Sequence, residues 1–525
     1  MSEITKLWWR DGVIYQIYPR SFQDSNGDGV GDLGGILARL DYLVALGVDA
    51  VWISPFYPSP MADFGYDVAN YCDVDPLFGT LSDFDALAQA IHQRGLKLIL
   101  DFVPNHTSNQ HPWFVESRSS RTNPKRDWYL WRDPAPDGGP PNNWMSHFGG
   151  PAWTLDAATG QFYYHAFLAE QPDLNWRNPD VRKAMYAAMR FWLDRGVDGF
   201  RMDVLWLLIK DDLFRDNPQS GEPVFNADQP ETQAIVRHMR AVLDEYSDRV
   251  LIGEIYLPLK SLVRYYGEPE EDPVRHLDGA QLPFNFHLIL TAWEAEPIAR
   301  LIRDYEDALP TGAWPNYVLG NHDQKRLASR IGPEQARVAA VLLLTLRGTP
   351  TLYYGDELGM PDARISADQV RDPAERNQPG LGRGRDPERS PMLWENRENA
   401  AFTAPGVATW LPLVWDWANF TVETEEADQG TMLKLYRRLL ALRRERPELF
   451  AGSIEDVQAE SGVLSYVRSY KGKRISVMLN LTGEERWMEC AAGRVLLSSF
   501  LDRENVVAGW IELRRNEAVV IERYA

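Results

Sequence analysis

The stretch GFRMDV (199–204) ends an apolar run with an acid, and three other stretches end in acidic or polar residues in the same way: LILDFVPNH (98–106), LIGEIY (251–256) and LGNHD (319–323). They place three carboxyl groups, those of Asp203, Glu254 and Asp323, just beyond aliphatic or β-branched runs. Such runs are typical of buried parallel strands, and in a barrel the chemistry lies at the carboxyl ends of the strands. Three acids gathered at that end predict chemistry on glycosidic bonds.

Apolar runs alternate with amphipathic patterns along the chain. The eight runs expected to form strands are 13–18, 48–54, 96–103, 197–204, 249–256, 277–284, 316–321 and 349–355. Apolar residues at three- and four-residue steps, followed by a glycine, predict helices over 34–47, 83–95, 179–196 and 334–348. This alternation predicts an α/β fold, a (β/α)8 TIM barrel. The alternative is a doubly wound open sheet, but the GxGxxG that commonly follows its first strand is missing.

Two further segments lie outside this alternation. Residues 106–172 are rich in Pro, Gly, Asn, Trp and Ser, with one short strand-like run at 160–167. A stretch of this length is too long for a plain loop, so we expect an inserted subdomain over the strand ends. After a helix at 430–449, four β-like runs predict a small antiparallel β domain. The expected domains are a barrel at 1–105 and 173–455, an inserted subdomain at 106–172 and a C-terminal β domain at 456–525.

Composition limits the partners and the compartment. The 525 residues carry a formal net charge of −20, which argues against nucleic acid or an anionic membrane as a partner. The two cysteines, Cys72 and Cys490, lie far apart and do not suggest a disulfide framework. The first residues show no cationic segment followed by an apolar one, and the most apolar window (338–346) is too short for a bilayer. We therefore expect a cytoplasmic protein, as a monomer or a homo-oligomer.

The strand-end acids differ in their neighbours. Strand alternation puts Arg201 on the same face as Asp203, and a guanidinium beside a carboxylate lowers its pKa, which suits a nucleophile. Glu254 ends an aliphatic run, where burial would keep it protonated as a proton donor. Each also has a structural interpretation, as a buried ion pair or a buried hydrogen-bonding group. The combination is more specific, because retaining glycoside hydrolysis needs one ionised and one protonated carboxyl about 5 to 5.5 Å apart.

A resemblance to a known family rests on these motifs. DFVPNH, GFRMDV, GEIY and GNHD, in this order and with these gaps, resemble the four sequence regions of the α-amylase superfamily of glycoside hydrolases. QPDLN (171–175), GYDVANY (65–71) and GRDPERSPMLW (384–394) are similar to segments of its oligo-1,6-glucosidase/α-glucosidase branch. The resemblance covers nearly the whole chain and is weakest after residue 455.

The resemblance implies a role for each matching residue. Asp203 would be the nucleophile, Glu254 the general acid/base and Asp323 the stabiliser of the transition state. The side chains implied to bind the terminal glucose are Asp67, His106, Arg201, His322 and Arg385, with Tyr66 stacked beneath the ring and Gln171 and Phe167 lining the pocket. Val204 follows the nucleophile; in the resembling branch, Val there accompanies α-1,6 activity and Thr or Ala a preference for α-1,4 linkages. Because such a difference is worth only about 1 to 3 kcal/mol, the linkage stays open.

The loop DSNGDGVGDLGG (24–35) is a candidate cation site. Its candidate ligands are Asp24, Asn26, Asp28, the Val30 carbonyl and Asp32. Gly29 and Gly31 let the chain curl so that these oxygens converge, as Ca²⁺ requires. In the resembling enzymes the same loop binds one structural Ca²⁺ or Mg²⁺, while the alternative is a Gly/Asp-rich turn that holds water. We expect no organic cofactor.

The function implied is a retaining, exo-acting α-glucosidase that acts on small α-glucosides through a covalent intermediate. A related alternative is glucosyl transfer or isomerisation, of the sucrose isomerase or trehalose synthase type, in which a sugar hydroxyl takes the place of water. The RLDRD-like segment of sucrose isomerases is missing from GLGRGRDPER (380–389), which favours hydrolysis. A remote alternative is a non-catalytic binding chain of the same fold, but such chains have lost the acids that this one keeps.

Overall fold

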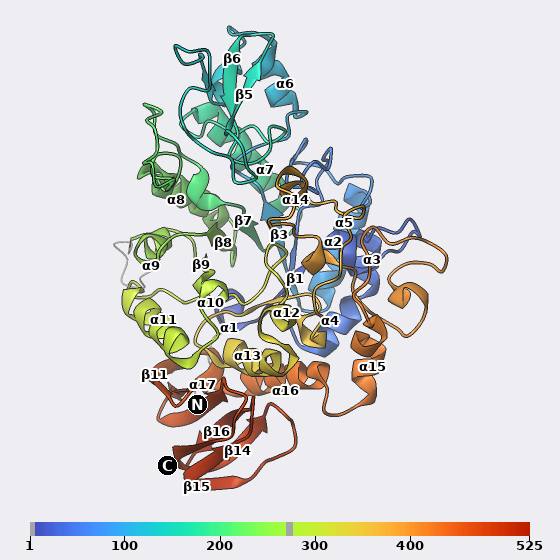
Figure 1. Ribbon diagram of the computed structural model, residues 1–525, viewed down its shortest axis with the longest axis vertical. Coiled ribbons are helices and arrows are strands. Elements are labelled where there is room, and N and C mark those ends of the chain that lie inside the picture. Colours follow the sequence, from blue (N-terminus) through green and yellow to red (C-terminus); the bar gives the residue numbers. More distant parts are fainter. Residues whose placement is uncertain (1–5, 269–276, 525) are drawn as a thin grey trace.

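A parallel sheet of seven strands forms the centre of the computed structural model, which describes residues 6–268 and 277–524. Its strand order is β10-β1-β2-β3-β7-β8-β9. The strands are β1 (Ile14–Ile17), β2 (Ala50–Ile53), β3 (Lys97–Phe102), β7 (Gly199–Met202), β8 (Val250–Ile255), β9 (Leu282–Asn285) and β10 (Thr351–Tyr353). Figure 1 shows this sheet between a small subdomain at the top and a second sheet at the bottom.

The barrel closes through a segment that we predicted as a full strand at 316–321. In the structure this segment makes only two isolated parallel bridges, from Tyr317 to Asn285 at the end of β9 and from Val318 to Thr351 of β10. The side chain of Asn316 donates to the carbonyl of Thr349 at 3.0 Å, so a side chain contacts backbone where a longer ladder would run. The two bridges join the edge strands and complete the predicted (β/α)8 barrel.

Helices cover the outside of the sheet. They are α1 (Trp8–Asp11), α2 (Pro19–Phe22), α3 (Leu33–Ala38), α4 (Leu40–Leu46), α5 (Leu81–Gln93), α7 (Pro179–Leu193), α8 (Glu231–Asp244), α9 (Leu259–Leu262), α10 (His287–Leu290), α11 (Ala295–Ala308), α12 (Leu327–Ile331), α13 (Pro333–Thr345), α14 (Pro373–Asn377) and α15 (Val422–Ala427). The helix predicted at 34–47 is two helices, because Arg39 leaves helical geometry at φ −106° and ψ 8°. Its guanidinium Nε donates to Gln23 Oε1 at 2.7 Å instead.

The inside of the barrel is filled by large apolar side chains below the site. These side chains come from five strands and include Ile14, Trp52, Ile99, Ile252 and Phe284, all buried. Every residue of β1, β7 and β8 is buried, as expected for parallel strands that are covered on both faces. The polar side chains of the site stand near the carboxyl ends of the strands, and these ends all lie at the same edge of the sheet.

The subdomain after β3 is a three-stranded antiparallel sheet with one helix. Its elements are α6 (Pro112–Ser119), β4 (Trp131–Arg132), β5 (Trp153–Asp156) and β6 (Gln161–Tyr164), in the order β4-β6-β5. Its core is aromatic, with the ring of Phe114 stacked on Trp131 at 5.7 Å between centroids. The bridge from His106 to Asp173 fastens its two ends together, above the carboxyl end of β3 (Figure 1).

The last part of the chain forms a six-stranded antiparallel sheet below the barrel. It follows α16 (Met432–Glu445) and α17 (Pro447–Phe450) and comprises β11 (Ser453–Glu460), β12 (Val463–Tyr470), β13 (Lys473–Asn480), β14 (Arg486–Ser498), β15 (Val506–Leu513) and β16 (Ala518–Arg523). Two of these strands, β11 and β15, were not predicted: β11 is polar, and both strands expose many of their residues. β11 begins three residues before the predicted boundary at 456. Arg468 of β12 joins this sheet to the barrel by donating to the carbonyl of Thr345 at 2.6 Å.

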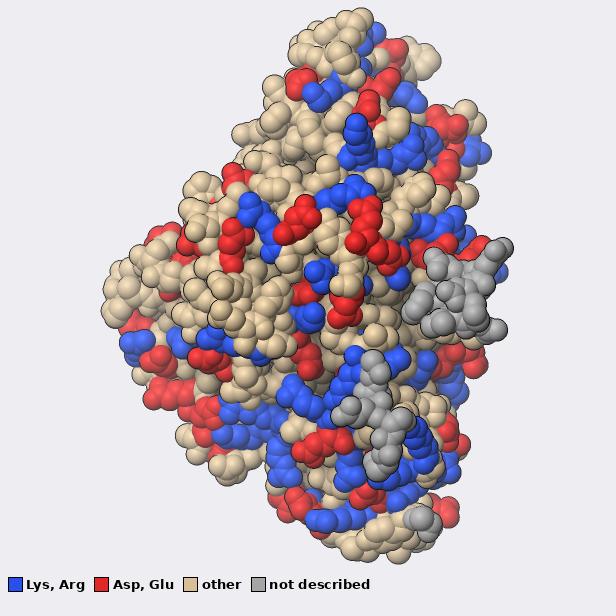
Figure 2. All heavy atoms as spheres, turned by 180° about the vertical axis from the view of Figure 1, so that it is seen from behind, with Lys and Arg blue, Asp and Glu red and all other residues tan. Residues whose placement is uncertain are grey.

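The charge is spread over the surface. On the face seen in Figure 2, acidic and basic side chains are interspersed, and the excess of acids does not gather into one patch. Within the described residues, no helix is both apolar enough and long enough to cross a bilayer.

Candidate active site

A cavity of about 350 Å³ opens at the carboxyl ends of the barrel strands, beneath the inserted subdomain. Most of the side chains predicted for the site line it: Tyr66, His106, Phe167, Gln171, Asp203, Val204, Glu254, Asp323 and Arg385. The three acids named from the strand ends therefore share one cavity. Arg201 and His322 lie directly behind these acids and are buried. Asp67 lies elsewhere.

One guanidinium holds three carboxylates at the floor of the cavity. Arg201 Nη1 donates to Asp203 Oδ1 at 2.9 Å and to Asp101 Oδ1 at 3.1 Å. Its Nη2 lies 2.8 Å from Glu254 Oε2. The register explains the contact with Asp101, which pairs with Arg201 across β3 and β7. We predicted Arg201 as the partner of Asp203 alone, whereas the structure divides its charge among three acids.

This division overturns the expected effect on the nucleophile. Burial raises the pKa of Asp203 well above its usual value, the negative Glu254 raises it further, and Arg201 only partly opposes them. Arg201 does lower the pKa of Asp203, as predicted, but the expected net depression does not follow, because burial and the acids on the neighbouring strands outweigh the guanidinium. Asp203 is therefore a buried acid whose negative charge is opposed by the nearby carboxyl groups of Glu254 and Asp101.

The backbone after the nucleophile is strained. Val204 adopts φ 36° and ψ 46°, in the left-handed region that a β-branched residue avoids. This turn points its N–H at Glu254, whose Oε2 accepts it at 3.0 Å. The close approach of the two strand ends also needs Gly253, where an added Cβ would lie 2.9 Å from Leu205. The strain therefore fixes the general acid/base candidate against the nucleophile's own strand, as strained residues at functional sites commonly do.

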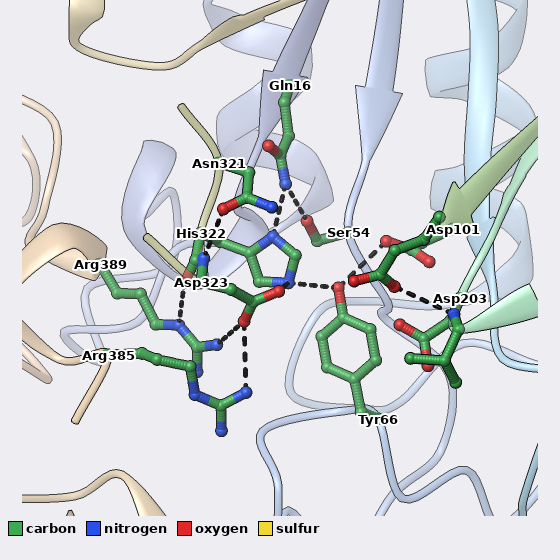
Figure 3. Close-up of polar contacts among 12 residues, drawn as sticks. Gln16, Ser54, Tyr66, Asp101, Asp203, Asn321, His322, Asp323, Arg385 and Arg389 are labelled. Carbon is green, nitrogen blue, oxygen red and sulfur yellow. Dashed lines mark hydrogen bonds and ion pairs between the residues drawn. The ribbon is translucent and has the colours of Figure 1, made fainter. Parts of the chain in front are cut away.

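Asp323 has a different environment, formed by two arginines from the loop after β10. Arg389 Nη2 donates to its Oδ1 at 2.9 Å and Arg385 Nη1 at 3.2 Å (Figure 3). Burial acts to raise the pKa of Asp323, but His322, Arg385 and Arg389 outweigh it and hold this pKa well below the usual range. Asp323 is therefore a permanent carboxylate.

His322 connects this corner with the floor of the cavity. Burial keeps the pKa of His322 well below its usual value, so the neutral ring acts on Asp323 through its N–H group while the arginines supply the positive charge. Nε2 faces both Asp323 Oδ2, at 3.3 Å, and the hydroxyl of Tyr66, at 2.6 Å. Because a carboxylate only accepts, Nε2 carries the hydrogen, and Nδ1 accepts from Gln16 Nε2 at 2.8 Å. The ring also stacks on Tyr66, with an angle of 4° between the planes.

Asp67 corrects one of our predictions. Its side chain is fully buried, and its carboxylate accepts from Ser59 Oγ at 2.8 Å and from the N–H groups of Ala62 and Asp63. These bonds make it a structural residue of its loop rather than a ligand of the sugar. Asp63, four residues earlier, lines the cavity instead and makes an ion pair with Arg385 at 2.6 Å.

The wall opposite Asp323 comes from the inserted subdomain and the end of β3. Gln171 Nε2 lies 3.2 Å from Asp63 Oδ2 and 3.2 Å from His106 Nε2. Burial lowers the pKa of His106 to about 4, so this ring is neutral at ordinary pH. Phe167 packs beside His106, with ring centroids 5.3 Å apart. These residues offer neutral hydrogen-bonding groups and an apolar face, which suits a sugar ring.

Several lining residues were not predicted. They are Asp63, His147, Phe148, Trp206, Tyr256 and Gln324. Trp206, Tyr256 and Gln324 each follow a predicted acid by one to three residues, so proximity to a motif could have identified them. His147 and Phe148 lie in the irregular part of the subdomain, where the sequence carries no periodic signal. Phe148 packs against the Arg385 guanidinium, which lies 4.9 Å from its ring centroid.

The candidate cation loop folds as a compact turn. Asp24 accepts the N–H groups of Asn26, Gly27 and Gly29, and Asp28 accepts that of Val30. Asp32 caps α3, accepting from Gly35 N–H at 2.6 Å. Within the described residues, no three His, Cys, Asp or Glu side chains converge as a metal site would require. The fit to a cation is thus incomplete, no step below uses one, and the bound Ca²⁺ stays a prediction.

Comparison with known proteins identifies the class. Residues 16–452 match the family described as alpha amylase, catalytic domain. The chain therefore belongs to the α-amylase family of glycoside hydrolases, and the site just described is that of an enzyme. Its three acids lie in this matched region.

Individual relatives place the chain more closely. It is 40% identical to a probable alpha-glucosidase of Rhizobium meliloti, with 97% of each chain covered, and 37% identical to an oligo-1,6-glucosidase of Halalkalibacterium halodurans, with 98% of each covered. A solved structure, that of the alpha-glucosyl transfer enzyme XgtA, superposes with a TM-score of 0.92 at 39% identity, over 99% of this chain and 100% of that one. These similarities confirm the oligo-1,6-glucosidase/α-glucosidase branch.

Proposed function

We propose that the protein is a retaining, exo-acting α-glucosidase that hydrolyses the terminal glucose of small α-glucosides. The observation that carries the proposal is the shared guanidinium, because Asp203 and Glu254 both contact Arg201, one at each terminal nitrogen. An inverting enzyme keeps its two carboxyl groups about 6.5 to 9.5 Å apart to admit a water between them. Two acids held by one guanidinium favour the closer spacing of a retaining enzyme.

The free oxygens of the two acids support a division of roles. Arg201 and the N–H of Val204 both contact Oε2 of Glu254, which leaves Oε1 for a proton. Arg201 contacts Oδ1 of Asp203, which leaves Oδ2 for attack. In the first step Asp203 attacks the anomeric carbon, the glycosidic bond breaks and Glu254 protonates the departing oxygen. In the second step Glu254 takes a proton from water, the water oxygen attacks the same carbon, and Asp203 leaves as a carboxylate.

The walls support exo action on a short substrate. Asp63 and Arg385 form an ion pair at 2.6 Å across one side of the cavity, and Arg385 also bonds Asp372 at 2.6 Å. Such a barrier would block a further sugar on that side, which supports exo action. The volume of about 350 Å³ is near the lower end of ordinary ligand sites. Asp323, held ionised, would accept hydrogen bonds from glucose hydroxyls.

Glucosyl transfer or isomerisation is the second candidate function, because it uses the same covalent intermediate. The similarity to an alpha-glucosyl transfer enzyme favours it. Analysis of the products from maltose, isomaltose, sucrose, trehalose and maltotriose would separate the two. Glucose as the main product supports hydrolysis, and new glucosides or sucrose isomers support transfer.

The test of the proposal is the release of nitrophenol from p-nitrophenyl α-glucoside. We expect the wild type to release it, and Asp203→Ala to lose several orders of magnitude in kcat/KM because no covalent intermediate can form. Asp41→Ala, on the exposed face of α4, is the control and should leave the rate unchanged. An Asp203→Ala enzyme as active as the wild type would refute the mechanism. The anomer first formed, read by NMR, should be the α-anomer.

A further inference from the structure

Asp101 is a buried carboxylate that no step of the proposed reaction uses. It is the last residue but one of β3, is 1% exposed, and is absent from the lining of the cavity. Its nearest cation is Arg201, which it contacts at 3.1 and 3.3 Å. Asp101 therefore competes with Asp203 and Glu254 for one positive charge.

The hydrogen bonds around Asp101 show which form it takes. Its Oδ2 accepts from Trp52 Nε1 at 3.3 Å and from the hydroxyl of Tyr66 at 3.0 Å. The indole and the guanidinium can only donate. Tyr66 also donates, because its hydroxyl already accepts the hydrogen on His322 Nε2, which the Asp323 carboxylate holds in place (Figure 3). Every neighbour of Asp101 thus supplies a hydrogen, and a proton on Asp101 would have no acceptor.

The same contacts decide where a proton rests in the cluster. Burial raises the pKa of Asp203 well above its usual value and that of Asp101 to about 7, so the cluster keeps a proton near neutral pH. Since the donors exclude this proton from Asp101, it resides on Asp203 or Glu254. A retaining glycosidase needs this state, with one acid ionised and the other protonated.

Resting on the proposed function, we propose that Asp101 is a positioning residue that neutralises Arg201, so that Asp203 and Glu254 keep one proton between them. Without the charge of Asp101, the whole charge of Arg201 would act on the pair and drive off that proton. The enzyme would then lack its general acid at neutral pH, although both catalytic acids were still in place. Asp101 thus acts on the reaction through Arg201 and never touches the substrate.

The charged and titratable groups around Asp101 come from every element packed against it. They are Tyr57 and Tyr66 from the loop after β2, Arg201 and Asp203 at the end of β7, Glu254 at the end of β8 and, through Tyr66, His322. The tyrosines have raised pKa values because they are buried, and His322 is neutral. Of these groups, only Arg201, Asp203 and Glu254 therefore contribute to the electrostatic potential at Asp101.

The test is the pH dependence of kcat/KM for Asp101→Asn, which keeps the shape and removes the charge. Loss of a negative charge makes it easier for both members of the pair to lose a proton, so both limbs of the profile should move to lower pH. At an effective dielectric constant of about 20, a unit charge about 4 to 6 Å away predicts a shift of roughly two to three pH units. At pH 7 the rate on maltose or isomaltose falls, and it recovers as the pH is lowered.

A second substrate separates the loss of the proton from a distorted site. α-Glucosyl fluoride needs little help from an acid, because fluoride is a good leaving group. At pH 7 Asp101→Asn should therefore cleave it within a few-fold of the wild-type rate, while its rate on isomaltose drops by tenfold or more. Trp52→Phe, which removes one donor to Asp101, should shift the limbs in the same direction by a smaller amount. It also tests the idea if Asp101→Asn folds poorly.

Asp198→Asn is the matched control. Asp198 is also buried and ion-paired, with His92 Nε2 at 2.7 Å and Lys97 at 3.1 Å, but it precedes β7 at the far end of the barrel. Its profile should keep both limbs in place. Asp101→Asn limbs that stay at the wild-type pH, or equal losses on the two substrates, would overturn the proposal. A wild type without glucosidase activity would instead refute the proposed function, before Asp101 is tested.

Discussion

Two clusters of three acids border the same cavity, and they differ in the number of cations they receive. In the Arg201 cluster, Asp101, Asp203 and Glu254 share one guanidinium. In the paired-arginine cluster, Asp63, Asp323 and Asp372 share two, those of Arg385 and Arg389. The two clusters contain similar residues, but they differ in how their acids bind protons.

The difference shows how one fold separates a proton store from a fixed charge. In the Arg201 cluster, burial and mutual repulsion raise the pKa of Asp101 and of Asp203. In the paired-arginine cluster the two guanidinium groups outweigh burial and lower the pKa of Asp323 and of Asp372. Asp63, which contacts Arg385 but not Arg389, keeps a raised pKa because it is buried, so the fixed charge of the second cluster lies on Asp323 and Asp372. The first cluster can give and take a proton, whereas these two carboxylates only accept hydrogen bonds. Retaining hydrolysis needs both.

The largest effect should come from one conservative change made in each cluster. Arg201→Lys keeps the charge, but a single ammonium cannot contact three acids at once, so kcat/KM should fall on the order of 10²-fold or more. In Arg385→Lys the second arginine, Arg389, still holds Asp323 ionised, so the loss should be about tenfold and should appear mainly in KM. Steady-state kinetics on p-nitrophenyl α-glucoside measure both.

Thermal melting of both variants controls for misfolding, since breaking a buried pair also destabilises a protein. Equal losses in the two variants would contradict the comparison. So would a larger loss at Arg385 than at Arg201.

A smaller effect is expected at Val204, which lies beside the Arg201 cluster and lines the cavity. Val204→Thr keeps the volume and adds a hydroxyl, so the ratio of kcat/KM for maltose to that for isomaltose should rise about tenfold. Competition between the two disaccharides, followed by product analysis, measures the ratio. Val44→Thr, on the outside of the barrel, is the control. A ratio that does not move would show that the linkage is chosen elsewhere.

The smallest effect concerns a third group of acids, those of the 24–35 loop, which make no ion pair with an arginine in the part of the chain that the structure describes. Asp24, Asp28 and Asp32 accept backbone N–H groups within their loop. If Ca²⁺ supplies the missing charge, saturating Ca²⁺ should raise Tm by a few degrees relative to EDTA. Asp28→Asn should reduce this rise. A Tm that is equal in Ca²⁺ and EDTA, together with no heat of Ca²⁺ binding in calorimetry, would remove the prediction.

Asp203, Glu254 and Asp323 could be predicted to share one cavity because each of them follows an apolar run. Strand alternation relates residues on one strand, and this is why Arg201 was assigned to Asp203. It does not show which residue of the next strand lies alongside. Asp101 lies within the motif DFVPNH, but only the register shows that it stands opposite Arg201. The residues that line the cavity could therefore be predicted better than the balance of charges among them.

Loops were harder than strands. Both Asp63 and Asp67 flank the pair Gly65–Tyr66, and only the local hydrogen bonds show that Asp67 caps its own loop while Asp63 faces the cavity. His147 and Phe148 belong to a subdomain whose chain has little periodic structure, so no pattern marked them. The strand at 316–321 was overestimated because an apolar run alone does not show that its neighbours use side chains for pairing.

That short segment leaves the barrel with a seam. Elsewhere adjacent strands are joined over three or four register pairs, but here two bridges, at Tyr317 and Val318, complete the ring. Local opening starts where the fewest backbone hydrogen bonds must break. His322 and Asp323 lie four and five residues after Val318. Opening of the barrel at this seam would therefore displace these two side chains first. The enzyme would then lose its activity on warming while most of its barrel was still folded.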